Sequence, residues 1–133
     1  MNGLITIPSA YPASKTIERL ISIIEAKGMT IFGRIDHADN ALKQGMDLRA
    51  TELIIFGNPK AGTVLMQDNQ VSGIDLPLKA LVWEDEQGKT WVSYNDTTWI
   101  GERHDLSEKS DSIIKAIENG IAAVVQNATT VEK

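Results

Sequence analysis

The chain has 133 residues, 42% of them hydrophobic and none of them cysteine, and 13 Lys and Arg against 18 Asp and Glu give it a net charge of -5. This composition indicates one ordinary globular domain and excludes disulfides, thiolate nucleophiles and cysteine-bound metals. A chain this acidic, without a basic stripe, is also a poor candidate for nucleic-acid binding.

The sequence shows no sign of export or of membrane insertion. Residues 1–8 lack the basic stretch and apolar run of a signal peptide. No apolar stretch approaches the ~20 residues that a membrane helix requires. We therefore expect a cytoplasmic protein that forms a single α+β domain over residues 1–133 and has no membrane partner.

Apolar periodicity predicts strands and helices in turn through the first 60 residues. Ile17, Leu20, Ile21 and Ile24 recur at helical spacing, and Gly28 is placed to end that helix. Alternating or unbroken apolar runs are typical of strands. The predicted elements are a strand at 3–7, a helix at 13–27, a strand at 29–36, a short helix at 38–44 and a strand at 53–56.

Two of these elements carry further expectations. In the short helix, Ala41 and Leu42 are expected to face inward. The run at 53–56 is apolar throughout, which predicts a strand at the centre of the sheet with both faces covered.

The second half of the chain predicts a short helix, a hairpin and a long final helix. The hairpin turn contains Gly88, and each of its strands carries a tryptophan, Trp83 or Trp91. The predicted elements are a helix at 61–68, strands at 78–84 and 90–95, a helix at about 107–126 and a frayed end over 127–133.

The order of these elements is β-α-β-α-β-α-β-β-α. Two long one-faced helices with one sheet predict a two-layer α+β domain, in which a mixed or antiparallel sheet of about five strands is covered by both helices on the same face. A three-layer α/β domain is the alternative.

Asp36 and His37 form the first candidate site, at the end of a predicted strand. A strand end holds side chains rigidly at the surface, which suits a general base oriented by a carboxylate. The simpler interpretation is that Asp36 caps the following helix, because Asp is a favoured cap.

The second candidate is the loop 57–63, which contains Asn58, Lys60 and Thr63. A strand that leads into a glycine-bounded loop and a helix start can bind an anion. The loop is not a P-loop, because Thr63-Val64 stand where Lys and Ser or Thr are required. The alternative is a tight turn fixed by Gly-Asn-Pro.

The third candidate gathers polar residues at the open end of the hairpin. Residues 78 and 95 are expected to face one another across the strands, which would bring five polar side chains together. They are Asp75, Lys79, Tyr94, Asn95 and Asp96. A carboxylate pair could serve acid–base chemistry or a hard cation, although Asp and Asn are equally common as turn formers.

The two histidines, His37 and His104, have no zinc-site spacing, so we expect neither a metal nor a cofactor. Trp99, Arg103 and His104 precede the final helix, and the sequence does not decide between a lid and a sheet edge for them.

Four blocks in order and spacing resemble the bacterial and archaeal family known as domain of unknown function 302. They are Ile35-Asp36-His37, Phe56-Gly57-Asn58-Pro59-Lys60-Ala61-Gly62-Thr63, Asp75-Leu76-Pro77-Leu78-Lys79 and Tyr94-Asn95-Asp96. The resemblance covers about residues 14–104, and Thr97 departs from the proline that many relatives have there. It implies a small α+β domain that is often dimeric, and it implies no established reaction.

Three functions follow as hypotheses. We favour a small-ligand or anion-binding module in which His37, the loop 58–63 and the hairpin group line one pocket. The first alternative is an enzyme with His37 as general base, oriented by Asp36 or Asp96. The second is a homodimeric interaction module without catalysis, which would use the hairpin aromatics and the apolar final helix.

Overall fold

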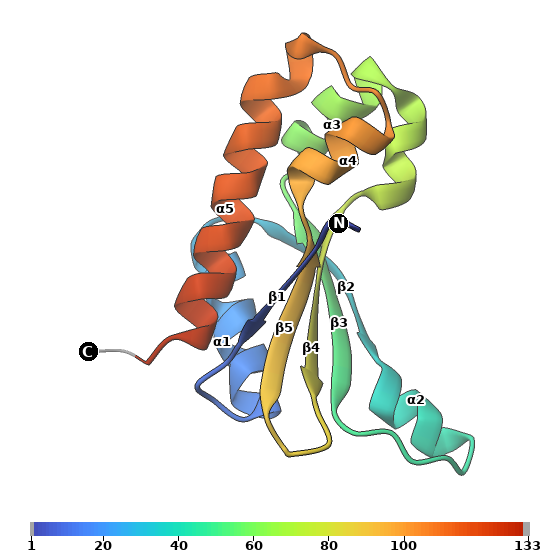
Figure 1. Ribbon diagram of the computed structural model, residues 1–133, viewed down its shortest axis with the longest axis vertical. Coiled ribbons are helices and arrows are strands. Elements are labelled where there is room, and N and C mark those ends of the chain that lie inside the picture. The colour runs from blue at the N-terminus through green and yellow to red at the C-terminus, as the bar shows by residue number, and fades with distance from the viewer. Residues whose placement is uncertain (1, 132–133) are drawn as a thin grey trace.

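The computed structural model describes residues 2–131, and at its centre lies one five-stranded sheet (Figure 1). The strand order is β1-β5-β4-β3-β2, and every neighbouring pair is antiparallel. The strands are β1 (Leu4–Pro8), β2 (Thr30–Asp36), β3 (Thr51–Gly57), β4 (Leu78–Glu84) and β5 (Thr90–Asn95). The predicted α+β class is confirmed, and the sheet is antiparallel throughout.

The helices differ greatly in length and position. The α-helices are α1 (Ala13–Ala26), α2 (His37–Lys43), α3 (Pro59–Asp68), α4 (Thr97–Arg103) and α5 (Asp111–Thr129), and the 3₁₀ helices are η1 (Gln70–Asp75) and η2 (Glu108–Ser110). The α1 helix ends where predicted, because Gly28 takes a φ of 73° and donates to the carbonyl of Glu25. Over residues 2–131, no helix has both the length and the apolar character needed to cross a bilayer.

The two long helices, α1 and α5, pack side by side on one face of the sheet, as expected (Figure 1). Their apolar stripes meet the side chains that point to this face from the inner strands. The buried residues of this core include Leu20, Ile24, Ile121, Val124 and Val125 of the helices and Ile54, Phe56, Ala80, Val82, Val92 and Tyr94 of the sheet. The fold is therefore two-layered, and the other face of the sheet is left without a long helix.

The hairpin forms with a register that differs by one residue from the expected one. Ala80 pairs with Tyr94, so residue 78 does not face residue 95 as expected. Asp85 fixes the turn, since its carboxylate accepts from the backbone N–H groups of Gln87 and Lys89 and from the indole of Trp91. The indole hydrogen bond lowers the pKa of Asp85.

Several local expectations were wrong. Leu42 is 66% exposed, and α2 has no buried residue, because this helix extends beyond the sheet (Figure 1). Strand β3 was expected at the centre of the sheet, but it lies next to the edge strand β2, and the central strand is β4. The end of the chain is helical to Thr129, which is buried, so the predicted fraying over 127–129 is absent; residues 132–133 lie outside the described part.

The antiparallel order decides which segments share an end of the sheet. Strand β3 ends beside the beginning of β2, since Gly57 pairs with Thr30. Asp36, at the end of β2, pairs with Glu52 near the start of β3. As a result α3, η1 and α4 gather at one end of the molecule and α2 lies at the other (Figure 1).

Candidate functional site

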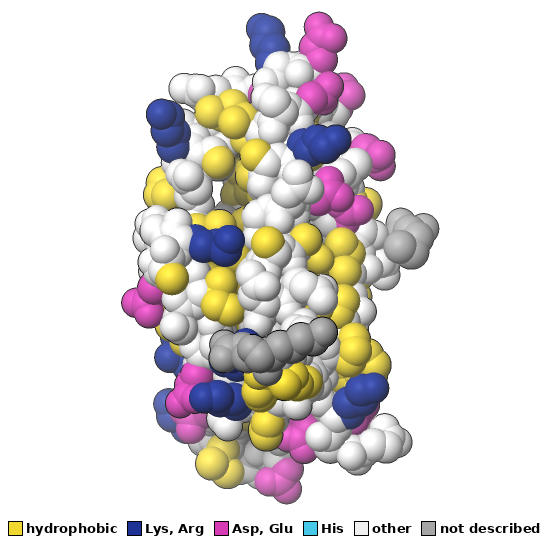
Figure 2. All heavy atoms as spheres, turned by 90° about the vertical axis from the view of Figure 1, so that its left-hand side faces the viewer, with side chains coloured by type: hydrophobic (Ala, Val, Ile, Leu, Met, Phe, Trp, Pro, Cys, Tyr) yellow, Lys and Arg dark blue, Asp and Glu magenta, His cyan; other side chains and the backbone are white. Residues whose placement is uncertain are grey.

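An apolar pocket lies at the junction of β3 and α3 and has a volume of about 240 Å³. It is lined by Phe32, Gly57, Asn58, Pro59, Ala61, Gly62, Thr63, Met66, Leu76, Pro77, Leu78 and Ile117. The lining thus comes from β2, the start of α3, the segment before β4 and the middle of α5. On the face that carries α5, Figure 2 shows hydrophobic side chains around a hollow.

The local sequence builds the wall of this pocket. Pro59 stands at the first position of α3, where its missing N–H costs nothing. Asn58 caps the helix by accepting from the N–H of Lys60 at 3.0 Å, and the Thr63 hydroxyl donates to the Pro59 carbonyl at 2.7 Å. On the opposite wall, the Leu76–Pro77 peptide bond is cis.

Two glycines keep the pocket open. A methyl group at Gly62 would meet only the terminal carbon of Met66, at 4.0 Å, and one at Gly57 would lie 3.8 Å from its nearest neighbour. Both distances are ordinary contacts, so packing does not require glycine at either position. Gly62 lies inside α3, where glycine is about 1 kcal/mol less favourable than alanine.

The electrostatics of the pocket favour apolar ligands. The side-chain oxygen of Asn58 already accepts a hydrogen bond from the N–H of Lys60, and its carbonyl accepts one from the N–H of Gly62. Lys60 is exposed and is not part of the lining. The start of α3 therefore offers little to an anion, and the polar groups at the pocket are the side chains of Asn58 and Thr63.

The predicted single cleft is not formed, because His37 lies at the other end of the sheet from Asn58 and Lys60. His37 is the exposed first residue of α2, and Asp36 caps that helix by accepting from the N–H of Asp39 at 2.9 Å. The geometry therefore agrees with the simpler interpretation of this pair, in which Asp36 caps the following helix. Consecutive strands of an antiparallel sheet end on opposite sides, which is why these blocks separate.

The remaining predicted residues also lie apart from one another. Lys79 points to the face of the sheet opposite the helices, as its pairing with Ile55 shows. Tyr94 lies in the core, where burial raises the pKa of its hydroxyl, and the charges of Asp96 and Glu118 add to that effect. Asp96 caps α4 through the N–H of Thr98.

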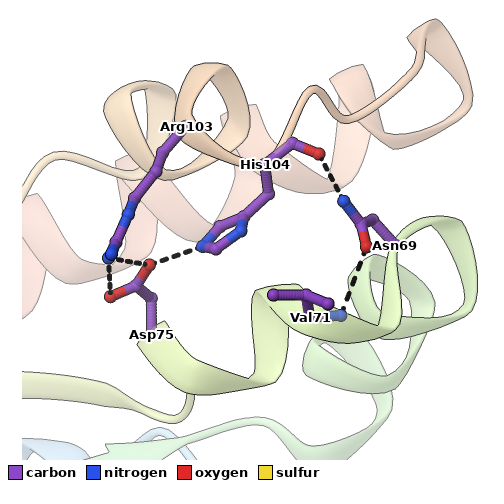
Figure 3. Close-up of polar contacts among 5 residues, drawn as sticks. All are labelled: Asn69, Val71, Asp75, Arg103 and His104. Carbon is purple, nitrogen blue, oxygen red and sulfur yellow. Dashed lines mark hydrogen bonds and ion pairs between the residues drawn. The ribbon is translucent and has the colours of Figure 1, made fainter.

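Asp75 belongs to a buried polar cluster that links η1 to α4 (Figure 3). Its carboxylate lies 2.5 Å from Nε2 of His104 and accepts from Arg103 at 2.8 and 3.0 Å. Asn69 extends the cluster, since its amide donates to the His104 carbonyl and its oxygen accepts from the N–H of Val71. Asp75 is thus held by two residues of α4 and its C-terminal end, which indicates a structural role for the cluster, and none of Asp75, Arg103 or His104 lines the apolar pocket.

A second carboxylate, that of Asp68, ties α3 to the segment before α5. It accepts from the Ser107 N–H and hydroxyl and from the Ser110 hydroxyl, at 2.6 to 3.0 Å. The Ser110 hydrogen bond is the largest of the effects that lower the pKa of Asp68. Sequence reasoning singled out neither Asp68 nor the pairing of Asp75 with His104, because 29 to 42 residues separate the partners.

Among residues 2–131, no three His, Asp or Glu side chains are grouped so that they could hold a metal ion. What the fold and the site define is a two-layer α+β domain with a small apolar pocket at one end of its sheet. The family model described as domain of unknown function DUF302 matches residues 5–124, and the chain belongs to that family.

Similar proteins support this assignment. An uncharacterized conserved DUF302 protein from Bacillus stearothermophilus has the same fold in its crystal structure, with a TM-score of 0.84 over 96% of this chain and 99% of that one, at 19% identity. Proteins from Brucella suis biovar 1 (strain 1330) and Brucella abortus biovar 1 (strain 9-941), each named fluoride-specific ion channel FluC 1, are 46% identical over 127 residues. The match covers 96% of this chain but only 50% and 47% of theirs, so the chain spans about half the length of these relatives.

Proposed function

We propose that this domain binds a small, mainly apolar molecule in the pocket between α3 and the Leu76–Leu78 segment. The observation that carries the proposal is Gly62, which lines the pocket from inside a helix although its local packing does not require a glycine. A residue that lowers helix stability and keeps a hollow open is better explained by a ligand than by the fold.

The size and lining of the pocket limit the ligand. A volume of about 240 Å³ is small, since ligand pockets are typically about 300–1,000 Å³. The side chains of Asn58 and Thr63 supply the polar contacts, so the ligand has an apolar body and one hydrogen-bonding group. A bare anion such as fluoride is a poor ligand, because burying a charge without paired donors is costly.

The channel relatives suggest what such binding would do. A protein twice as long that is named a fluoride-specific ion channel contains a segment 46% identical to this chain. We propose that the domain is a ligand-responsive regulatory module for such a channel. Fluoride flux through liposomes containing the Brucella suis protein, with and without the matching segment, tests this: the proposal requires a difference, and equal flux would contradict it.

Direct titration tests the pocket itself. Indole and 1-hexanol are suitable probes, because each combines an apolar body with one uncharged hydrogen-bonding group. We expect saturable heat on titration into the protein by calorimetry and at least a tenfold loss of affinity in Gly62→Leu, whose side chain occupies the hollow. Gly120→Ala is the control, because Gly120 lies in α5 outside the pocket. Affinity that is absent in the wild type, or equal in the two variants, would refute the proposal.

The geometry around His37 does not support the hypothesis of an enzyme that uses this residue as its general base. His37 is exposed, its neighbour Asp36 serves as a helix cap, and the apolar pocket is at the other end of the sheet. A general base needs a binding site within hydrogen-bond reach of its ring. The Asp75–His104 pair is buried between η1 and α4 and is likewise outside the pocket.

A further inference from the structure

Phe32 is an exposed aromatic side chain that lines the ligand pocket from the edge strand β2. We propose that the pocket selects an uncharged aromatic ligand, with its ring against Phe32 and its polar group beside Asn58 or Thr63. This inference rests on the proposed function, because it assigns a chemical class to the ligand of the same pocket. It is carried by the position of Phe32, which the proposed function does not use.

A β-bulge brings Phe32 to the pocket. In the ladder between β2 and β3, Ile31 and Gly33 have partners and Phe32 between them has none. Side chains alternate in an unbroken strand, so Phe32 would there point away from the face on which Ile31 packs against the core. A bulge changes the direction of a side chain, and Phe32 lines the pocket together with Ile117 of α5, the helix that covers that face.

The ring of Phe32 is free to contact a ligand. Phe32 is 49% exposed although it lies at an apolar hollow, so a molecule in the pocket would cover surface that the fold leaves in water. Two aromatic rings that pack offset or edge to face gain more than the area they bury. An aliphatic molecule of the same size lacks this gain, so the position of Phe32 favours an aromatic ligand.

The other walls of the pocket suit a flat ring. Gly57 and Gly62 present backbone without a side chain, and glycine allows a ligand to approach the backbone closely. Met66 also lines the pocket, and a thioether sulfur makes favourable contacts with the edge of an aromatic ring. These walls and Phe32 therefore favour the same class of molecule.

The polar side chains at the pocket match an uncharged group. The side-chain oxygen of Asn58 accepts from the N–H of Lys60, which leaves the amide nitrogen of Asn58 as a donor. The Thr63 hydroxyl donates its hydrogen to the Pro59 carbonyl, which leaves the hydroxyl oxygen as an acceptor. Among residues 2–131, neither group has a further hydrogen-bond partner.

This inventory excludes a charged ligand group. A hydroxyl, a carbonyl or a ring N–H finds a partner in Asn58 or Thr63. A carboxylate would find a single donor group among the lining side chains, because Lys60 is exposed and is not part of the lining. A charge that is poorly paired is costly to remove from water, so the ligand is neutral.

Titration with phenol and cyclohexanol, followed by ¹⁵N-resolved NMR, tests the aromatic class. The two probes share a hydroxyl group and a six-membered carbon ring, and they differ in that the phenol ring is aromatic and flat. We expect the wild type to bind phenol about 2- to 12-fold more tightly, which is the gain of an aromatic pair. Equal affinity, or tighter binding of cyclohexanol, would overturn this inference but not the proposed function. Absence of binding by both probes would contradict both.

Variants at position 32 test the role of the phenylalanine. Phe32→Leu keeps an apolar side chain, so the preference for phenol should fall to less than about twofold, whereas Phe32→Tyr keeps the ring and should retain it. Val71→Ala is the control, because Val71 is 67% exposed on η1 and outside the pocket. A phenol preference that survives in Phe32→Leu or is lost in Phe32→Tyr would overturn the assignment. If Phe32→Leu fails to fold by circular dichroism, Phe32→Tyr and the wild-type comparison still decide.

Benzoate tests the requirement for an uncharged group. It has the same ring as phenol and carries a carboxylate at pH 7. We expect it to bind the wild type roughly tenfold more weakly than phenol, or worse, because the pocket does not pair its charge. Benzoate binding as tight as that of phenol would overturn the uncharged class.

Discussion

Substituting Gly62 by leucine should stabilise the protein while it fills the pocket. Replacing a helical glycine by leucine gains about 0.7 kcal/mol from helix propensity. The new side chain meets only Met66 within 4.0 Å of its Cβ and extends beside other apolar walls. Partial burial adds about 1 kcal/mol, less than the ~1.5–3 kcal/mol of a fully buried leucine. The total expected gain in the free energy of unfolding is about 1.5–2 kcal/mol.

Urea denaturation followed by circular dichroism measures this gain. Gly120→Ala isolates the helix contribution, because a methyl there meets Met29 at 3.8 Å and lies outside the pocket. We expect this control to gain about 0.5–1 kcal/mol, with an unchanged slope against urea for both variants. If Gly62→Leu is no more stable than the control, or is destabilised, then the hollow is not available to a side chain and the reasoning fails.

Three further perturbations test structural links outside the pocket. Asp75→Ala leaves the buried His104 without its acidic partner and should lower the free energy of unfolding by about 2–4 kcal/mol in urea denaturation. Asp68 has a lowered pKa, so its ionised form stabilises the fold above pH 4 and this contribution is lost as the pH falls below about 4; Asp68→Asn should flatten that dependence in pH-dependent melting. Gly3→Ala should destabilise by about 2–4 kcal/mol, because φ is 76° there and a methyl would lie 2.3 Å from Trp99.

These outcomes share one control, Glu86→Gln in the exposed hairpin turn, which should leave stability within about 0.5 kcal/mol. A tolerated Asp75→Ala would show that the polar cluster does not link η1 to α4. An unchanged acid dependence in Asp68→Asn would remove the role assigned to its serine partners. A neutral Gly3→Ala would show that the contact with Trp99 relaxes freely.

Local patterns were sufficient to predict most elements of the fold. The helical stripe of α1 and the turn of the β4–β5 hairpin depend on residues close in sequence, and both formed at nearly the expected positions. The α4 helix was missed, because Thr97–Arg103 is too short to show periodicity. The exposure of Leu42 was missed for a different reason, since an apolar residue on a helix does not reveal whether another element lies against it.

Few of the residues proposed from sequence line this pocket. Asn58 and Thr63 of the loop after β3 do so, whereas Asp75 and Lys79, which were singled out on either side of the start of β4, do not. Phe32 and Ile117 complete the lining from distant parts of the chain, and no local signal marks them. His37 was grouped with Asn58 and Thr63 because it also follows a strand end, but in this antiparallel sheet β2 and β3 end on opposite sides.

The most direct test of ligand binding in the pocket is a ¹⁵N-resolved NMR titration of the wild type with indole. We predict saturable shifts of the amide signals of Gly57, Gly62, Thr63 and Ile117, all of which line the pocket, and little change at His37. In Gly62→Leu the same titration should leave those signals in place. Shifts that are absent, that do not saturate or that are equally large in both proteins would contradict the account.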